Sequence, residues 1–351
     1  MRVLITGHDG YIGTVLTPLA RDAGHDAVGL DAYLFEGCSL GGDPNVAGQR
    51  IDVRDVEIDH LRGFDAVIHL AAISNDPVGD LSPSRTYEIN HRATVRLAWL
   101  AKRAGVKRFV FASSCSLYGA ASADDLLRES APLNPVTAYG EAKVLAERGL
   151  SDLADNLFSP VFLRNATVYG YSARLRLDLV VNDLVASAFA IGDVVIRSDG
   201  TPWRPLVHVE DASQAALAAV EAPRDAVHNE AFNIGRNGEN YQIRDLADVV
   251  RAVIPGSRVT YAQGGGPDTR CYRVDFSKAE HRLPGFRPRW SVDDGVRELV
   301  EAFRAYGLSS EDLSSPRFVR LRQIQALQEE GRLGLDLRWL VQPESIGSPR
   351  M

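Results

Sequence analysis

The sequence predicts an α/β fold: a Rossmann-type doubly wound parallel sheet with a smaller C-terminal lobe on the substrate side. In the first half, short apolar runs alternate with longer helical stretches, which is typical of a parallel sheet covered by helices. A glycine-rich turn follows the first run directly. After about residue 171 the elements become shorter and the loops richer in Gly and Pro, which indicates a second lobe.

Strands are expected where β-branched and apolar residues form short runs bounded by turn signals. These runs are residues 2–6, 27–31, 49–53, 65–70, 108–113 and 161–164, with a further strand at 231–235 that returns to the main sheet. Helices are expected over residues 11–24, 83–104 and 138–154. Apolar spacing at Phe318, Leu321, Ile324 and Leu327 predicts a helix in the tail that packs on the domain or on a neighbour, with an open charged extension as the alternative.

Composition limits the class of protein. A length of 351 residues suggests about two domains. With 45% hydrophobic and 24% charged residues, the chain can bury a core. The net charge of −7 and the absence of a long basic run argue against a nucleic-acid partner. We expect no membrane span and no signal peptide, because the apolar runs are too short.

The cysteines indicate the compartment. Cys38, Cys115 and Cys271 lie far apart and are odd in number. Neither a disulfide framework nor a metal site is therefore expected, and a cytoplasmic location is the default. These observations predict a soluble α/β enzyme, and composition alone says nothing about its reaction.

The turn after the first strand has the spacing G-x-x-G-x-x-G, with Gly7, Gly10 and Gly13 at the glycines and Tyr11 and Ile12 between them. Glycine at these positions allows a tight turn, close approach of backbone N–H groups to a pyrophosphate and close helix–sheet packing. The N-terminus of the following helix favours negative charge. Because the motif joins a strand to a helix, it predicts a dinucleotide site, with a glycine-rich turn without a ligand as the alternative.

Residues at the next strand ends suit the same ligand. Asp31 ends the second strand, where a carboxylate accepts hydrogen bonds from the adenosine ribose and repels a 2′-phosphate, so NAD is favoured over NADP. Asp52 follows the third strand and is expected near the adenine amino group, with a plain surface carboxylate as the alternative. The small residues at the end of the fourth strand would let the cofactor pass close to the backbone, or simply pack tightly: Leu70, Ala71 and Ala72.

A proton-transfer set is predicted at the next strand end. Tyr139 and Lys143 form a Y-x-x-x-K pattern, which puts both side chains on one face of a helix. A lysine ammonium beside a phenol favours the phenolate, which suits proton exchange near neutral pH. Ser114 follows the strand at 108–113, at the edge of the sheet where α/β enzymes gather their chemistry. Taken alone, the Tyr–Lys pair could be an ordinary surface pair.

Together these motifs resemble the extended short-chain dehydrogenases/reductases of the NAD-dependent sugar-nucleotide epimerase/dehydratase family. The resemblance covers about residues 1–305 and includes, in order, the glycine motif, Asp31, His69 to Ala72, Asn90, a Ser-Ser-x-x-x-Tyr-Gly segment and Y-x-x-x-K. It implies NAD as the cofactor, with Asn90 at its site, and a nucleotide sugar as the substrate. It also implies a homodimer paired through the helices near 88–104 and 139–154.

The resemblance assigns a role to each catalytic residue. Tyr139 would exchange a proton with a sugar hydroxyl, Lys143 would hold the nicotinamide ribose, and Ser114 would hydrogen-bond the reacting oxygen. Residues 1–170 would then bind NAD, residues 171–305 would mainly shape the sugar site, and residues 306–351 would form a helical extension outside the family core.

The resemblance also suggests substrate contacts in the second half. Arg204 lies in a segment like the family's R-x-x-x-H-V-x-D, and Arg270 in one like its second phosphate clamp. Both would hold the nucleotide diphosphate, with surface arginines as the alternative. The family's L-R-x-x-N-x-x-G is altered, because Thr167 replaces its Asn and an Asn stands two residues earlier, at Asn165. Asn165 and Thr167 are the candidate contacts at that strand end.

Two further positions separate the possible reactions. Cys115 and Ser116 stand where the family's sugar 4,6-dehydratases carry Asp and Glu, so a standard 4,6-dehydration is not expected. Both are candidate substrate contacts, with a buried, inert thiol as the alternative for Cys115. The sequence thus predicts an NAD-dependent nucleotide-sugar epimerase acting through a transient keto-sugar. An NAD(P)H-dependent 4-keto nucleotide-sugar reductase and a non-catalytic dinucleotide-sensing protein are the alternatives.

Overall fold

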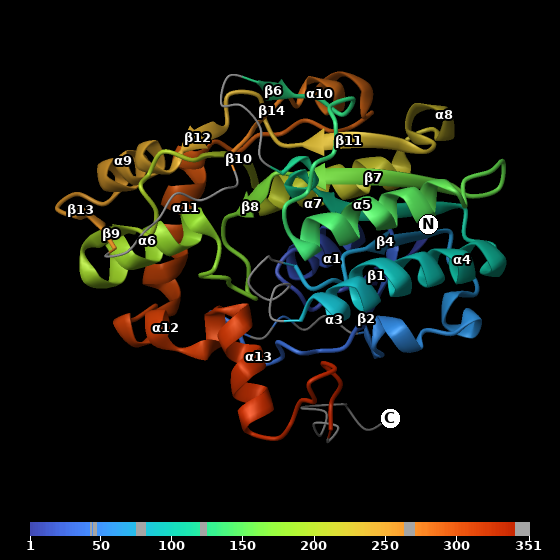
Figure 1. Cartoon of the computed structure of the whole chain (residues 1–351), viewed down its shortest axis with the longest axis horizontal. Coiled ribbons are helices and arrows are strands. Elements are labelled where there is room, and N and C mark those ends of the chain that lie inside the picture. Colours follow the sequence, from blue (N-terminus) through green and yellow to red (C-terminus); the bar gives the residue numbers. More distant parts are fainter. Residues whose placement is uncertain (43, 45–47, 75–81, 120–124, 263–270, 341–351) are drawn as a thin grey trace.

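A computed structural model of the chain describes residues 1–42, 44, 48–74, 82–119, 125–262 and 271–340. At its centre lies a sheet of seven parallel strands in the order β11-β7-β5-β4-β1-β2-β3 (Figure 1). The strands are β1 (Arg2–Thr6), β2 (Asp26–Asp31), β3 (Gly48–Arg50), β4 (Ala66–His69), β5 (Arg108–Ser114), β7 (Ser159–Asn165) and β11 (Glu230–Ile234). The prediction of a Rossmann-type doubly wound sheet is confirmed.

The strand order reverses at β1, which has β2 on one side and β4 on the other. From β1 the chain runs outward through β2 to β3, then returns to β4 and continues outward through β5 and β7. Open α/β sheets bind ligands in the crevice that such a reversal leaves beyond the carboxyl ends of the strands. The fold therefore places the turn after β1 and the turn after β4 beside a ligand crevice.

Helices cover both faces of the sheet, because alternate strand residues point to opposite sides. On one face, Val3 and Ile5 pack in an apolar cluster with α1 (Gly13–Asp22) and α7 (Val209–Glu221). On the other face, Leu4 packs in a cluster with α4 (Thr94–Ala104) and α5 (Ala138–Ser151). The outer strand β11 comes from the second half of the chain and pairs in parallel with β7.

The helix expected over residues 83–104 is divided into three parts. It begins as α3 (Pro83–Thr86), continues as a π-helical stretch, η3 (Tyr87–Ala93), and ends as α4. Short 3-10 turns lie after β3 and β5: η1 (Val53–Asp55), η2 (Ile58–Leu61) and η4 (Cys115–Tyr118). π-helical stretches often lie next to functional sites, and this one contains Asn90.

The second lobe has its own apolar core, formed by α6 (Val180–Ile191), α9 (Ile243–Val253) and α11 (Val292–Tyr306). A three-stranded sheet borders it: β8 (Thr167–Tyr169), β10 (Trp203–His208) and β12 (Asn240–Gln242). Four short elements form two further strand pairs: β9 (Asp193–Ile196) with β13 (Arg258–Tyr261), and β6 (Leu126–Leu127) with β14 (Arg273–Val274). The short helices α8 (Arg224–Val227) and α10 (Ser277–Arg282) lie near β11 (Figure 1).

The chain then forms α12 (Ser310–Ser314), the turn η5 (Pro316–Phe318) and α13 (Arg320–Glu329), followed by a loop closed by a bridge between Leu333 and Trp339. Ile324 and Leu327 of the helix expected in the tail are buried. In Figure 1 this segment crosses the lower side of the molecule, from α12 below the second lobe to the region below β2. Among the described residues, no helix is long and apolar enough to cross a membrane.

Candidate active site

The three glycines of the first turn lie on the wall of a cavity of about 790 Å³ at the reversal point of the sheet. Gly7 has a φ of +77°, and a Cβ there would stand 2.7 Å from the backbone N of Ala71 after β4. A Cβ on Gly13 would stand 2.2 Å from the carbonyl oxygen of Gly7. Any side chain at these positions would therefore clash with backbone, so glycine keeps this cradle at the start of α1 open for a phosphate.

Tyr11 and Ile12 also line the cavity, at the start of α1. The Tyr11 hydroxyl donates a hydrogen bond to the carbonyl of Gly170 at 2.6 Å, and Asn182 Nδ2 donates to the same hydroxyl at 3.2 Å. Tyr11 therefore joins the glycine turn to the second lobe. Since its hydroxyl is used in these hydrogen bonds, its apolar ring is the part that lines the cavity.

Residues predicted at the ends of β2, β3 and β4 line the same cavity: Asp31, Asp52, Leu70, Ala71 and Ala72. The Asp31 carboxylate accepts hydrogen bonds from the backbone N–H groups of Asp9 and Tyr33, at 3.1 and 2.8 Å, which fixes its orientation. Asp52 Oδ2 lies 2.6 Å from Arg54 Nη2, so its carboxylate is already paired. Asp31 is thus the better placed of the two carboxylates to receive ribose hydroxyls.

Two predicted contacts are not on the cavity wall. Asn90 is fully buried and exchanges two hydrogen bonds of 2.8 Å with the backbone of Ile73. It therefore fixes the loop after β4, which itself lines the cavity. Cys115 is also buried, its Sγ donates to the carbonyl of Arg164 at 3.1 Å, and burial raises the pKa of its thiol. Of the two alternatives given for Cys115, the structure therefore favours the buried, inert thiol over a substrate contact.

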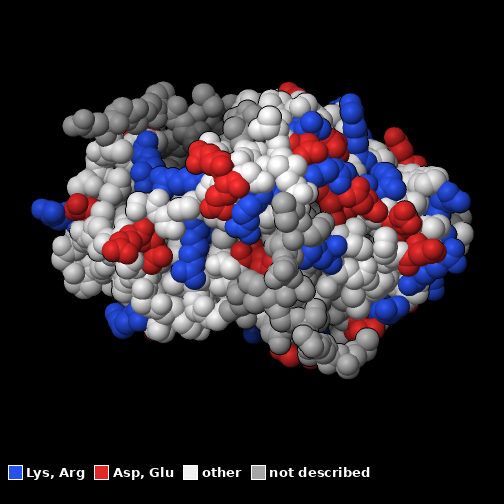
Figure 2. Space-filling model, turned by 90° about the horizontal axis from the view of Figure 1, so that it is seen from below, with Lys and Arg blue, Asp and Glu red and all other residues white. Residues whose placement is uncertain are grey.

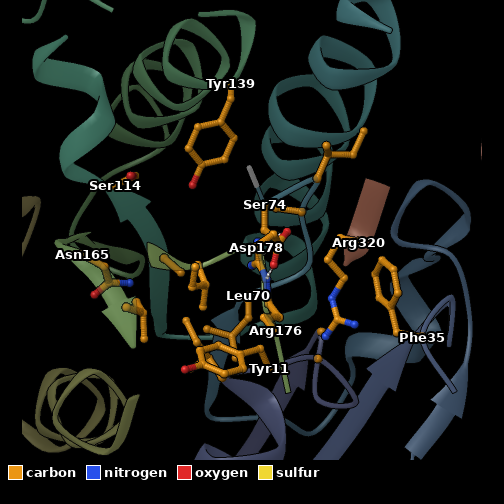
Figure 3. A pocket seen from close by; sticks show the side chains of 18 of the residues that line it. Tyr11, Phe35, Leu70, Ser74, Ser114, Tyr139, Asn165, Arg176, Asp178 and Arg320 are labelled. Atoms are coloured by element: carbon orange, nitrogen blue, oxygen red, sulfur yellow. Dashed lines mark hydrogen bonds and ion pairs between the residues drawn. The ribbon is translucent and has the colours of Figure 1, made fainter. Parts of the chain in front are cut away.

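Ser114, Tyr139 and Lys143 all line the cavity. Figure 3 labels Ser114 and Tyr139. The N-cap of α5 fixes Tyr139 in its first turn, because Thr137 Oγ1 accepts a hydrogen bond of 3.2 Å from the N–H of Gly140. Gly140 also lets the helix approach the turn η4 closely, since a Cβ there would stand 3.1 Å from the carbonyl oxygen of Ser116. Figure 3 shows the Tyr139 hydroxyl pointing into the cavity, on the side where Ser114 lies.

Lys143 is 3% exposed, and its Nζ lies 5.7 Å from the centre of the Tyr139 ring. The ammonium donates a hydrogen bond of 2.6 Å to the carbonyl of Ala112. Burial lowers the pKa of Lys143 to about 7, and the nearby Glu147 carboxylate opposes this only in part. The charge beside Tyr139 therefore depends on pH near neutrality, which suits a residue that tunes proton transfer.

The substrate side of the cavity contains Ser116, Asn165, Thr167 and Arg204. Asn165 pairs with Ser114 in the register of β5 and β7, so the two side chains leave adjacent strand ends. The buried Asn165 Oδ1 has no hydrogen-bond partner among the described residues, and an unpaired buried acceptor is costly without a ligand. Arg204 is 8% exposed and donates a hydrogen bond of 2.8 Å to the carbonyl of Trp203. Arg270 lies outside the described residues.

Sequence analysis missed the charged residues that follow β8. Arg174 forms a buried ion pair with Asp9 of the glycine turn, with Nη2 2.8 Å from Oδ1. Arg176 pairs with Asp178 at 2.9 Å, and both line the cavity. Burial raises the pKa of Asp9 to about 6, although Arg174 acts in the opposite direction. The alternation Arg174-Leu-Arg176-Leu-Asp178 was the available signal, but only the fold reveals its partners.

A glycine turn at the sheet reversal and a Ser–Tyr–Lys set on the same cavity wall are the features expected of a dinucleotide-dependent enzyme. The sequence model of the NAD dependent epimerase/dehydratase family matches residues 3–235. The match covers more than half of the chain, so the chain belongs to this family of NAD-dependent enzymes.

Several relatives resemble the chain over most of its length. It is 28% identical over 335 residues to a UDP-glucose 4-epimerase of Lactobacillus helveticus, covering 89% of this chain and 100% of the relative. It is 27% identical to UDP-glucuronic acid decarboxylase 1 of Arabidopsis thaliana, covering 87% and 70%. The structure of MoeE5 in complex with UDP-glucuronic acid and NAD superposes with a TM-score of 0.76 at 28% identity, covering 87% and 99%.

The cavity of this chain suits NAD. The glycine turn lines the cavity beside the N-terminus of α1, where a pyrophosphate is favoured, and Asp31 ends β2 where a ribose would lie. The volume of about 790 Å³ is that of a site for a substantial organic ligand. NAD would thus be held by the turn after β1 and the ends of β2 and β4, with its reactive end toward Tyr139.

Proposed function

We propose that the protein is a nucleotide-sugar epimerase that acts through a transient keto-sugar. The observation that carries the proposal is the shared cavity wall formed by Ser114, Tyr139 and Lys143 beside the glycine cradle. Relatives described as UDP-glucose 4-epimerases support the same reaction class. The substrate is then a sugar linked to a nucleoside diphosphate.

The residues have separate tasks in this reaction. Tyr139 accepts the proton of a sugar hydroxyl as a keto-sugar forms, and returns it after the sugar turns its other face. The Lys143 ammonium stabilises the phenolate, and the Ser114 hydroxyl donates a hydrogen bond to the reacting oxygen. Bound NAD supplies the acceptor and donor of the hydride. Asn165, with its unpaired Oδ1, is a hydrogen-bond acceptor for a sugar hydroxyl next to Ser114.

A dehydration would need further groups on this wall. Eliminating water from a sugar requires an acid for the leaving hydroxyl and a base for a carbon-bound proton. After Ser114 the chain carries a buried thiol whose pKa is raised by burial, and the hydroxyl of Ser116. Neither is a carboxylate, which favours epimerisation over elimination.

The proposal can be tested on purified protein. The protein is denatured and the released NAD is quantified, and native protein is incubated with UDP-, dTDP-, GDP- and CDP-sugars. We expect about one NAD per chain and an isomeric sugar nucleotide, with no net consumption of cofactor. Consumption of NADH or NADPH only in the presence of a keto-sugar would instead identify a reductase.

We also propose that the chain forms a homodimer through α4 and α5. Trp99 of α4 is 44% exposed and Leu145 of α5 is 36% exposed. Large apolar side chains on adjacent helices favour association. Light scattering coupled to gel filtration should give twice the monomer mass, and a variant with Trp99→Glu and Leu145→Glu should give the monomer mass.

A further inference from the structure

The segment after α11 covers one end of the cavity. We call residues 308–340 the C-terminal strap. Six of its residues line the cavity: Leu313, Val319, Arg320, Arg322, Ile324 and Leu337. The strap begins beside the second lobe, where the N–H of Leu177 donates a hydrogen bond of 2.8 Å to the carbonyl of Phe318. It therefore spans from the second lobe to the nucleotide-binding half.

The strap is attached to the ends of β2 and β3. Trp339 Nε1 donates a hydrogen bond of 2.7 Å to the carbonyl of Ala32, directly after Asp31. Arg54 Nη1 donates a hydrogen bond of 2.8 Å to the carbonyl of Asp336. Arg338 pairs with Asp55, with Nη2 3.0 Å from Oδ1. These contacts hold the strap over the strand ends that carry the two predicted adenosine contacts.

Apolar side chains of the strap pack against the ends of β2 and β4. Ile324, Leu327, Leu333 and Leu337 pack against Ile73, which follows β4, and against partly buried side chains that follow β2. This cluster is separate from the cores of the two lobes. Because this packing buries apolar surface, it holds the strap against the rest of the cavity wall.

Arg320 is a buried cation of the strap that lines the cavity. It is 3% exposed, and its guanidinium carbon lies 4.0 Å from the centre of the Phe35 ring. Its Nη2 donates to the carbonyl of Arg174 at 3.1 Å, and its buried Nη1 has no partner among the described residues. Figure 3 shows the guanidinium at the cavity, between Phe35 and Arg176.

The two arginines next to Arg320 have carboxylate partners, and Arg320 has none among the described residues. Arg174 is paired with Asp9, and Arg176 with Asp178, whereas Arg320 has no ion pair within the part of the chain that the structure describes. Burial lowers the pKa of Arg320 to about 10; the guanidinium groups of Arg176 and Arg174 act in the same direction, and the Asp178 carboxylate opposes them only in part. A buried cation with an unused N–H is costly unless an anion approaches it.

We propose that the strap closes the adenosine half of the cavity over bound NAD, and that Arg320 donates hydrogen bonds to its pyrophosphate. Arg320 contacts the carbonyl of Arg174, which pairs with Asp9 of the glycine turn, so it lies on the pyrophosphate side. A planar guanidinium suits paired phosphate oxygens. The strap thereby keeps NAD bound through successive turnovers. The proposal rests on the family's use of NAD and deepens the proposed function, but it does not depend on the epimerase reaction.

The test measures retention of NAD rather than activity. Wild-type protein and the variant Arg320→Met are dialysed, and NAD is quantified after denaturation at successive times. Loss of a charge-assisted contact should make NAD leave about ten- to a hundredfold faster. Arg297→Met is the control, because Arg297 is an exposed residue of α11 that pairs with Asp293 and neither lines the cavity nor belongs to the strap. Equal retention in wild type and Arg320→Met would overturn the proposal.

A second arm separates the two diphosphates that could lie near Arg320. Calorimetric titration of UDP-glucose into NAD-loaded protein should give the same affinity for wild type and Arg320→Met. Lower affinity for UDP-glucose with unchanged NAD retention would assign Arg320 to the sugar nucleotide and overturn the proposal. The retention of NAD requires neither turnover nor a sugar nucleotide, so this measurement can succeed if the epimerase proposal fails.

A third measurement uses the wild-type chain alone, in case Arg320→Met does not fold. Hydrogen exchange of backbone amides is followed with and without NAD. NAD should slow exchange in α13 and in the loop between Leu333 and Trp339, although neither belongs to the sheet. Unchanged exchange in these segments would show that the strap does not close over NAD.

Discussion

At the scale of single residues, the proposed chemistry depends most on the Tyr139 hydroxyl. Replacement by Phe keeps the ring in its place and removes only the group that carries the proton. We expect Tyr139→Phe to lower kcat by about 10²- to 10⁴-fold, with unchanged NAD content and thermal stability. Tyr261→Phe is the control, because Tyr261 is 57% exposed and does not line the cavity. Wild-type turnover by Tyr139→Phe would remove the acid/base assignment.

The buried Lys143 should make the free energy of unfolding depend on pH. Its pKa is lowered to about 7 in the folded chain, so folding releases its proton between pH 7 and its ordinary range near 10.5. The cost of burying the charge is therefore fully present below pH 7 and is relieved as the pH rises. In NAD-free protein, Lys143→Met should raise the free energy of unfolding more at pH 6 than at pH 9, by about 2 kcal/mol. Thermal unfolding at both pH values measures this, and a gain that grows with pH would contradict it.

Predictability from sequence also differs among residues. The position of the three glycines and Asp31 on the cavity wall could be predicted, because it follows from the strand or turn on which they lie. The burial of Cys115 could be predicted only as one of two alternatives, because it depends on the turn into η4 after β5, which places this side chain in the core. Arg320 could not, because its neighbours Phe35 and Arg174 are distant in sequence and meet it only in the fold.

At the scale of elements, the pair of Asp9 and Arg174 joins the glycine turn to the segment after β8. Arg174→Met would leave a buried carboxylate without its partner, which should cost about 3–5 kcal/mol of unfolding free energy. The pKa of Asp9, already raised to about 6, would rise further, so the loss should be larger at pH 8 than at pH 5. Chemical unfolding at the two pH values measures the loss.

The matched control for that pair is the double variant. Asp9→Asn combined with Arg174→Met removes both charges and should recover much of the stability at pH 8. A double variant as unstable as Arg174→Met, or a loss independent of pH, would show that packing rather than charge pairing accounts for the effect.

The sequence predicted a strand at each of the seven places in the main sheet. Most of these strands are local apolar runs that are largely buried, whereas β3 has no buried residue. It predicted the helix over 83–104 less well. The hydrogen bonds between Asn90 and the backbone of Ile73 hold a π-helical stretch against the loop after β4, and no local pattern encodes that contact. The attachment of the strap could not be predicted either, since Trp339 and Arg54 donate hydrogen bonds to backbone carbonyls of residues that are distant in sequence.

At the scale of the whole molecule, the cavity contrasts with the rest of the surface. The net charge of the chain is −7, and Figure 2 shows acidic and basic side chains interspersed on the face that it presents. The described cavity wall has seven basic residues, Lys143, Arg54, Arg176, Arg197, Arg204, Arg320 and Arg322, and four acidic ones, Asp31, Asp52, Asp178 and Asp183. The local field therefore favours anions although the molecule as a whole is acidic.

This contrast predicts how salt affects catalysis. A sugar nucleotide carries a diphosphate, and its attraction to a basic cavity weakens as salt shortens the Debye length from about 10 Å at 0.1 M to about 3 Å at 1 M. We expect kcat/KM to fall several-fold over this range of NaCl while kcat stays constant, because charge acts on capture. Arg204→Gln should raise KM and flatten the salt dependence, whereas Arg332→Gln, outside the cavity, should leave both unchanged. A kcat/KM that rises with salt would mean that the global negative charge, and not the cavity, governs the approach of the substrate.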